Sequence, residues 1–299
     1  MRGLDEARAF YEEQGAEMIR SRFPAYEGRI AVGLAGHGSE CFGFDDELSR
    51  DHDFQRGFCL WLDDETDIEI GIPLSRAYRE LTGGKTGERS ALGEKSLGVR
   101  RISDFYRRYT GSPGAPECWQ QWMSLPSWAL AEATNGQVWR DDQGRFTEIR
   151  EAILHNMPED VRKKKLAAGC ALMAQSGQYN VSRCRRHGEE AAARLACCEF
   201  VNHTLAMLFL LNARHMPFYK WAFRAAKELP KLSELVPTLE ALLREPDEDT
   251  IERVSAAVIE ELRAQDLTDG GWDFLEPHAY AVMRRIKNPE IAALHIMEV

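Results

Sequence analysis

The chain has 299 residues, 44% of them hydrophobic, which is enough for one large or two ordinary domains with a proper core. Its net charge of −10 argues against non-specific nucleic-acid binding, which depends on Lys and Arg neutralising phosphates. The seven cysteines show no CxxC pair and no zinc-binding spacing, as is typical of reduced cysteines in a cytoplasmic protein. No apolar run reaches membrane-spanning length, and no signal-peptide core is recognisable. We therefore expect a cytoplasmic protein without a membrane or nucleic-acid partner.

Hydrophobic periodicity predicts helices and strands together in the first half of the chain. Residues 63–81 are predicted to be loop and then helix, with Pro73 near the start of that helix. The tryptophans at 119, 122, 128 and 139 are expected in the core. The other predicted elements are a helix at 4–21, strands at 30–35, 54–62 and 99–102, a helix from 103 to 109, a helix at 119–133, and a turn with a short strand at 135–141.

After about residue 147 the pattern becomes helical only. The predicted helices are 158–175, 189–212, 218–229, 232–244, 249–264 and 273–286. The sequence therefore predicts an α+β fold in which a mixed sheet with helices is followed by an all-helical bundle. We place the domains at 1–147 and 148–299, with the helical domain closing a cleft.

Two small motifs follow each other in the first domain. Gly36-His37-Gly38-Ser39 comes directly after the first predicted strand, and Asp51-His52-Asp53 precedes the second. A glycine-serine turn offers backbone N–H groups and a hydroxyl to phosphates. Carboxylates at i and i+2 of a strand share one face, where they suit Mg²⁺ or Mn²⁺. An ordinary turn followed by a solvated acidic loop is the alternative interpretation.

The order and spacing of these motifs resemble the signature of the polymerase-beta-type nucleotidyltransferase superfamily. Further segments resemble one bacterial branch, known only as domain of unknown function 4037. They are Gly38-Ser39-Glu40-Cys41, Ser49-Arg50-Asp51-His52-Asp53, Gly57-Phe58-Cys59-Leu60-Trp61, Gln178-Tyr179-Asn180 with Arg183, and Leu211-Asn212 with Tyr219-Lys220-Trp221. The resemblance implies a nucleotidyltransferase-like first domain. In outline, the chain is similar to the antibiotic-modifying nucleotidyltransferases, which have a small mixed-sheet domain and a helical domain.

One position departs from the superfamily pattern. The resemblance implies a third carboxylate on a strand next to the one that carries the aspartate pair. The corresponding segment here is Leu97 to Ile102, which carries Arg100 and Arg101 instead. Glu94 and Asp104 flank it, but neither has the expected setting. Because the third carboxylate often acts as general base, its absence leaves metal binding plausible and puts catalysis in doubt.

The second domain supplies candidate ligand contacts. The segment 178–183 is interpreted as a polar connector between helices, with Tyr179 and Asn180 facing the nucleotide and Arg183 contacting phosphate. Lys220 is the candidate for a triphosphate contact, as implied by the antibiotic-modifying relatives. The alternatives are a capped surface loop for 178–183 and a plain solvated lysine for Lys220.

The sequence thus favours a Mg²⁺-dependent nucleotidyltransferase that moves a nucleoside monophosphate from an NTP, with ATP the favoured donor, to a small-molecule or protein hydroxyl. Asp51 and Asp53 are the predicted catalytic and metal-binding residues, and Gly38 and Ser39 the predicted phosphate cradle. The alternative is a catalytically impaired nucleotide-binding regulator of the same fold. An antitoxin-like partner role is a third, less favoured hypothesis, because this chain carries its own helical domain.

Overall fold

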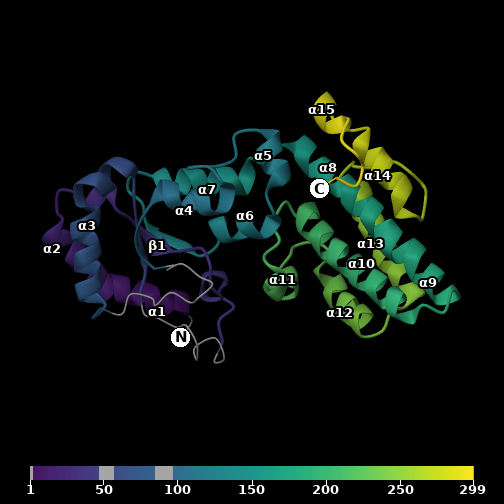
Figure 1. Ribbon diagram of the computed structural model, residues 1–299, viewed down its shortest axis with the longest axis horizontal. Helices are drawn as coiled ribbons and strands as arrows, with labels where there is room; N and C mark the ends of the chain where they lie inside the picture. Colours follow the sequence, from purple (N-terminus) through teal and green to yellow (C-terminus); the bar gives the residue numbers. More distant parts are fainter. Residues whose placement is uncertain (1–2, 47–56, 85–96, 299) are drawn as a thin grey trace. The chain divides into compact units, whose positions relative to one another are not determined.

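The computed structural model describes residues 3–46, 57–84 and 97–298 (Figure 1). The chain forms two compact units. The first unit consists of Met1–Glu117 with Ala129–Asn156, and the second of Cys118–Trp128 with Met157–Val299. A small mixed sheet precedes many helices, which confirms the predicted α+β class. The predicted domain boundary after residue 147 falls inside helix α7 (Arg145–His155).

The first unit is built on a four-stranded sheet with the order β3-β2-β1-β4. The strands are β1 (Ala31–Leu34), β2 (Cys59–Leu62), β3 (Gly98–Arg101) and β4 (Gln137–Arg140). Strand β1 is antiparallel to both β2 and β4, whereas β2 and β3 are parallel. Gly33 lies opposite Cys59, so the end of β1 lies beside the start of β2. The register therefore brings the turn after β1 next to the chain that enters β2.

Helices cover both faces of this sheet. Its buried residues alternate between the faces, as the strand period requires. Leu60 and Leu62 pack against the N-terminal helices and α3, and Trp61 packs against Phe105 and Phe146. The helices are α1 (Gly3–Phe10), the π-helix η1 (Tyr11–Gly15), α2 (Ala16–Arg22), the 3-10 turns η2 (Glu27–Arg29) and η3 (Glu40–Phe42), α3 (Asp64–Leu81), α4 (Ile102–Thr110), α6 (Ser127–Thr134) and α7.

The predicted helix at 4–21 is confirmed, because α1, η1 and α2 follow without a break. Its central turn is π-helical, which the apolar spacing did not reveal. Gly15 ends that turn and lies against the ring of Phe58, a fully buried residue directly before β2. A Cβ atom on Gly15 would lie 2.5 Å from Phe58 Cζ, so only glycine fits the observed packing.

The prediction of a loop after Asp63 was wrong, because α3 begins at Asp64. The Asp63 side chain accepts a hydrogen bond of 2.7 Å from the Thr66 N–H, which caps the helix at once. Pro73 lies inside α3 rather than near its start. Pro73 and Glu69 are both exposed, so the carbonyl that loses its usual N–H partner faces water.

The single helix predicted over 119–133 was also wrong. It is divided into α5 (Trp119–Ser124) and α6, with Leu125 in an extended conformation between them. Pro126 explains the break, because a proline disfavours helical geometry in the preceding residue. Of the four tryptophans expected in the core, Trp122 is buried, whereas Trp128 is 42% exposed. Trp119 and Trp139 are half-buried.

The second unit is helical. Its central helix is α10, which packs against α8, η5 and α12. Its elements are α5, α8 (Glu159–Met173), the π-helix η5 (Ala174–Val181), α9 (Ser182–Arg186), α10 (Glu190–Leu211), α11 (Tyr219–Ala226), the 3-10 turn η6 (Ser233–Leu235), α12 (Val236–Arg244), α13 (Glu248–Ala264), α14 (Leu275–Met283) and α15 (Pro289–Ala292). All six helices predicted after residue 147 are found.

By length and composition alone, α10 could cross a membrane, and half of its apolar window is buried within the second unit. The core helix of a soluble protein meets the same criterion. Several residues of α10 belong to the main hydrophobic cluster of this unit, among them Phe200, Leu205 and Leu208. The packing of α10 within the second unit therefore explains its hydrophobic composition.

Candidate functional site

The turn after β1 is held in a fixed backbone conformation. Gly36 and Gly38 have φ angles of +109° and +129°, which side-chain-bearing residues rarely adopt. The Gly36 N–H donates to Asn135 Oδ1 at 2.7 Å, and Asn135 Nδ2 donates to the Gly36 carbonyl at 2.7 Å. The Gly136 N–H donates to the Cys41 carbonyl at 2.7 Å. The loop before β4 thus clamps the turn from one side.

Tyr109 of α4 supports the same turn. Its hydroxyl oxygen would lie 2.8 Å from a Cβ atom built on Gly36, and the side chain is buried. Burial raises the pKa of the Tyr109 phenol well above its usual value, so the group stays protonated. With Asn135 and Tyr109 both in contact, Gly36 cannot accept a larger residue without local rearrangement.

His37 and Ser39 are the partly accessible side chains of the turn. His37 Nδ1 lies 3.6 Å from Glu132 Oε1 of α6, and the side chains are 69% and 11% exposed. Contact with this carboxylate raises the pKa of His37. Ser39 is half-buried, and its hydroxyl bonds to none of the described residues. The turn therefore carries a hydroxyl that is free of the described residues and an imidazole whose pKa is raised.

The Glu40 carboxylate folds back over Gly38. A Cβ atom on Gly38 would lie 2.4 Å from Glu40 Oε1 and 2.6 Å from Oε2. The space next to the Gly38 Cα is thus filled by a carboxylate, an anion of the protein itself. A phosphate at this turn would have to displace Glu40 or share its surroundings with it.

Asp51 and Asp53 lie outside the described residues, as do His52 and Glu94. The prediction that Asp51 and Asp53 share one face therefore stays a prediction. Within the described ranges, no three His, Cys, Asp or Glu side chains come together as a metal site.

The strand beside β2 carries arginines, as the sequence indicated. Arg100 lies opposite Trp61 and Arg101 opposite Leu62. Asp104 lies in α4 and pairs with Arg107, at 2.9 Å between Nη1 and Oδ1. Glu40 and Glu132 are described carboxylates that contact the turn, and neither belongs to β3.

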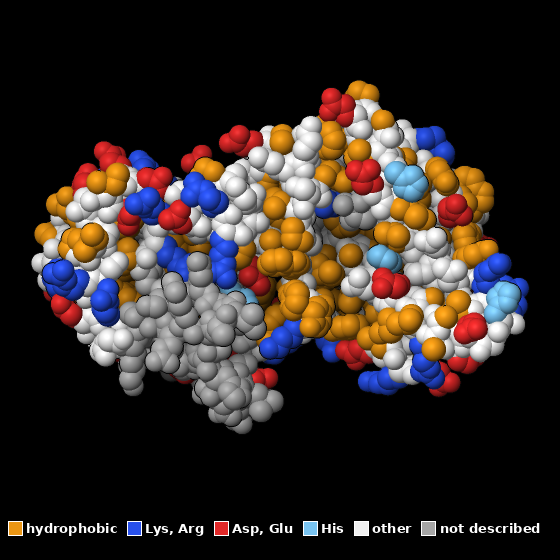
Figure 2. Space-filling view, viewed as in Figure 1, with side chains coloured by type: hydrophobic (Ala, Val, Ile, Leu, Met, Phe, Trp, Pro, Cys, Tyr) orange, Lys and Arg blue, Asp and Glu red, His pale blue; other side chains and the backbone are white. Residues whose placement is uncertain are grey.

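The sequence interpretation missed that the first unit supplies its own cations. Arg100 and Arg101 of β3 and Arg107 and Arg108 of α4 line one pocket. Two Arg-Arg pairs seven residues apart were a usable signal, because a strand that turns directly into a helix brings both pairs to one edge. In Figure 2, basic and acidic side chains lie in mixed groups over the elements of this unit.

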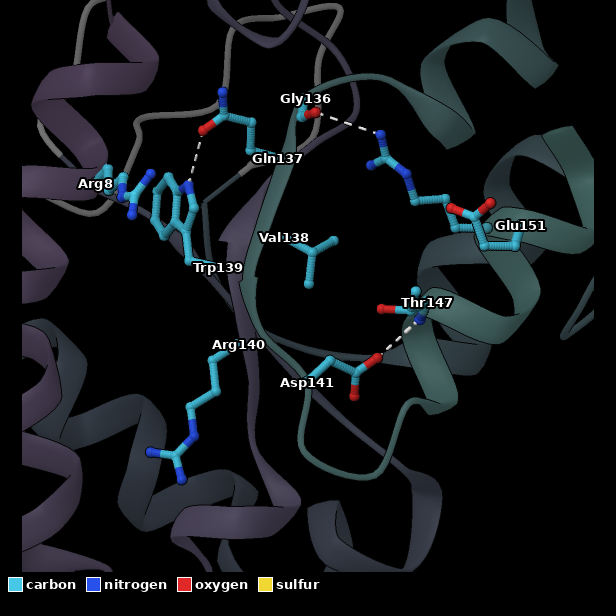
Figure 3. Close-up of a pocket in the computed structure, with 10 residues that line it drawn as sticks. Arg8, Gly136, Gln137, Val138, Trp139, Arg140, Asp141, Thr147 and Glu151 are labelled. Carbon is cyan, nitrogen blue, oxygen red and sulfur yellow. Dashed lines mark hydrogen bonds between the residues drawn. The ribbon is translucent and has the colours of Figure 1, made fainter.

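A second pocket, of about 640 Å³, lies at the free edge of β4. Strand β4 passes between Trp139 and Arg8 on one side and Thr147 and Glu151 on the other (Figure 3). Its arginines already have partners. Arg140 pairs with Glu27 and Asp142, Arg8 pairs with Glu12, and Arg150 donates to the carbonyls of Asn135 and Gly136. The arginine contacts in this pocket therefore tie β4 and the loop before it to the rest of the first unit.

The predicted connector at 178–183 was wrong, because these residues continue the helix of α8 through η5 and α9. Gln178 is structural. Its Nε2 donates to Glu252 at 2.6 Å, and its Oε1 accepts from the Leu275 N–H at 2.9 Å. Tyr179 and Arg183 are exposed and contact each other, with 3.2 Å between Arg183 Nη1 and the tyrosine hydroxyl. Asn180 is half-buried.

Lys220 lies in the first turn of α11, exposed, with Nζ 4.9 Å from the centroid of the Trp221 ring. Its surroundings are aromatic, because Phe218 packs on Tyr219 and Trp128. Hydrophobic side chains gather around α11 in Figure 2. Helices α9 and α11 lie at opposite ends of α10 (Figure 1). Because α10 is about 33 Å long, Arg183 and Lys220 are not brought together.

Comparison with known protein families finds a match to one family model. Residues 122–222 match the model of a family described as a domain of unknown function (DUF4037). The match supports the predicted branch over about a third of the chain, from α5 to α11. It includes Tyr179, Asn180, Arg183 and Lys220 but not the turn at Gly38. No curated protein and no solved structure matches the chain significantly.

Proposed function

We propose that the first unit binds the phosphates of a nucleoside triphosphate at the turn from Gly36 to Ser39 and transfers its nucleotidyl group to a hydroxyl. The observation that carries the proposal is this turn, with its two positive φ angles and its clamp by Asn135. A backbone fixed before ligand arrives loses little entropy on binding. The Gly-Ser and Asp-x-Asp motifs resemble the nucleotidyltransferase signature, and this resemblance is the reason for proposing a nucleoside triphosphate as the ligand.

In this proposal the chain contributes two functions. The turn amides and the Ser39 hydroxyl orient the phosphates. Asp51 and Asp53 hold the divalent cation, which when bound stabilises charge on the phosphate oxygens. The acceptor oxygen bonds to the α-phosphorus, the bond from that phosphorus to the bridging oxygen breaks, pyrophosphate leaves, and the hydroxyl proton passes to water.

A second candidate function is nucleotide binding without transfer. Arg100 and Arg101 favour it, because they lie in β3, where the resemblance implies a third carboxylate. Arginine remains protonated at neutral pH and cannot act as a general base. A regulator that senses a nucleotide would need the turn and the aspartates for binding but would not need the general base.

One experiment separates the two candidates. The full chain is incubated with Mg²⁺, each NTP in turn, and a pool of cell metabolites and proteins. Pyrophosphate release and a mass gain equal to a nucleoside monophosphate are measured, and NTP binding is followed by calorimetry. Asp51→Asn and Asp53→Asn are the controls. Transfer that both variants abolish supports the enzyme. Binding without transfer supports the regulator, and absence of NTP binding overturns both.

A further inference from the structure

The arginine pocket of the first unit lies along the open edge of the sheet. Strand β3 is an edge strand, and α4 follows it directly and runs back beside it. The pocket between them has a volume of about 870 Å³. Four arginines and two aspartates line it: Arg100, Arg101, Arg107, Arg108, Asp67 and Asp104. Positive side chains therefore exceed negative ones by two.

The two aspartates are already committed to two of the arginines. Arg101 Nε lies 2.6 Å from Asp67 Oδ2 of α3, and Arg107 Nη1 lies 2.9 Å from Asp104 Oδ1. Arg100 is half-buried, and none of the carboxylates in the described parts of the chain pairs with it. A partly desolvated guanidinium without a counter-charge is a strong binding group for a phosphoryl oxygen.

The backbone of β3 adds donors to the same edge. The Gly98 N–H donates to the Phe58 carbonyl at 3.0 Å, so Gly98 is a residue that faces β2. In a parallel ladder, alternate residues bond to the same neighbour. The amides of Val99 and Arg101 therefore point toward the open edge, where the guanidinium groups lie. N–H groups at a sheet edge form concave sites for anions.

The pocket and the turn after β1 belong to the same unit and have Tyr109 as a common neighbour. Arg100 and Arg108 are both close enough to Tyr109 to act electrostatically on its phenol. Tyr109 is in turn packed against Gly36. The arginines of the pocket and the turn therefore approach the same buried side chain within the first unit.

We propose that the pocket between β3 and α4 is a phosphoryl-binding subsite in which Arg100 is the principal contact. The inference rests on the proposed function only for the identity of its ligand. The phosphoryl group belongs either to the β- and γ-phosphates of the nucleotide bound at the turn or to a phosphorylated acceptor. The resemblance implies a carboxylate on β3. The arginines found there instead bind an anionic substrate.

The test uses the full chain and calorimetry with inorganic tripolyphosphate. Arg100→Ala should weaken tripolyphosphate binding about tenfold to a hundredfold, since a charge-assisted contact is lost. Arg100→Lys keeps the charge and should recover part of the affinity. Arg20→Ala is the matched control, because Arg20 is an exposed arginine of α2 that pairs with Glu17 outside the pocket. Unfolding midpoints check that each variant folds.

The two sources give different results with nucleotides. If the phosphates are those of the nucleotide, Arg100→Ala weakens ATP binding and leaves AMP binding unchanged, and ATP displaces tripolyphosphate. If they belong to an acceptor, tripolyphosphate still binds to the ATP-saturated protein. If the protein binds tripolyphosphate but not ATP, the proposed function is refuted and the subsite proposal is supported. Equal tripolyphosphate affinity of the wild type and folded Arg100→Ala, or an equal loss in Arg20→Ala, overturns the subsite.

Discussion

The fit between Gly177 and Phe200 gives a prediction whose size follows from the packing. Gly177 lies in η5 and faces α10. A Cβ atom there would lie 2.3 Å from Phe200 Cδ2 and 2.7 Å from Cγ, and the Phe200 side chain is fully buried. A ring enclosed on all sides cannot move away cheaply. Overpacking of this kind costs about 1–3 kcal/mol, and the helix propensity of alanine returns about 1 kcal/mol.

We therefore expect Gly177→Ala to lower the free energy of unfolding of the second unit by up to about 2 kcal/mol. Gly169→Ala is the matched control, because Gly169 also faces α10 but meets the flexible Met207, with 3.2 Å to its Sδ. That variant should be neutral or stabilised by up to about 1 kcal/mol. Hydrogen exchange of the α10 amides measures the stability of both variants, and Gly177→Ala should accelerate exchange by up to about thirtyfold. Equal exchange in the two variants would contradict the packing explanation.

Three further predictions concern charge. Glu40→Gln removes the carboxylate from the turn at Gly38, so NTP affinity measured by calorimetry should rise by about fivefold, or about 1 kcal/mol; an unchanged or weaker affinity would argue against phosphate at this turn. Burial, with the nearby Lys164 charge, lowers the pKa of Lys165 to about 8. Between pH 8 and the unfolded pKa of about 10.4, the unfolded chain keeps a proton that the folded chain has lost, so this group makes stability rise with pH. Lys165→Met should therefore stabilise the protein at pH 7 by up to about 3 kcal/mol in urea unfolding, with the gain vanishing near pH 10; a gain independent of pH would refute this. Finally, Lys220→Ala should weaken NTP binding about tenfold to a hundredfold if Lys220 contacts the triphosphate. Because α9 and α11 lie at opposite ends of α10, Arg183→Ala should not have the same effect, and equal losses in the two variants would contradict the expectation that Lys220 alone contacts the triphosphate.

The elements that the sequence predicted well are those in which local and global signals agree. The strand at 30–35 is an apolar run bounded by a glycine turn, and β1 occupies its centre. The helical pattern of 189–212 is long, and α10 covers it almost completely. In both cases the residues that set the local conformation also form the core, so periodicity alone is sufficient.

The errors arose where one residue decides between two local conformations. Asp63 was interpreted as part of a loop, although its carboxylate caps α3. Pro126 divides α5 from α6, although the apolar pattern runs across it. The polar segment 178–183 suggested a connector, whereas Gln178 uses its amide to hold α13 and α14 to the helix. Such contacts join residues that are far apart in the sequence, so a local pattern cannot show them.

For the candidate site, the sequence indicated the turn and the arginines of β3 but not how they are supported. Asn135 in the loop before β4 and Tyr109 in α4 hold the turn, about 70 to 100 residues downstream. The pocket formed by the two arginine pairs depends on the parallel pairing of β2 and β3. Register between distant strands has no signature in a single sequence, so these neighbours emerge only from the folded chain.

The two π-helical stretches have a consequence for how this chain compares with its relatives. A π-helical turn contains one residue more than the α-helical turn it replaces, so it is an insertion absorbed within a helix. Both stretches contain a glycine against a phenylalanine ring, Gly15 at Phe58 and Gly177 at Phe200. A relative that lacks one residue within 174–181 could keep α8 and α9 in register against α10. The direction of its equivalents of Tyr179 and Asn180 would then change, so a single gap in an alignment would mark a protein with a different exposed surface at this position.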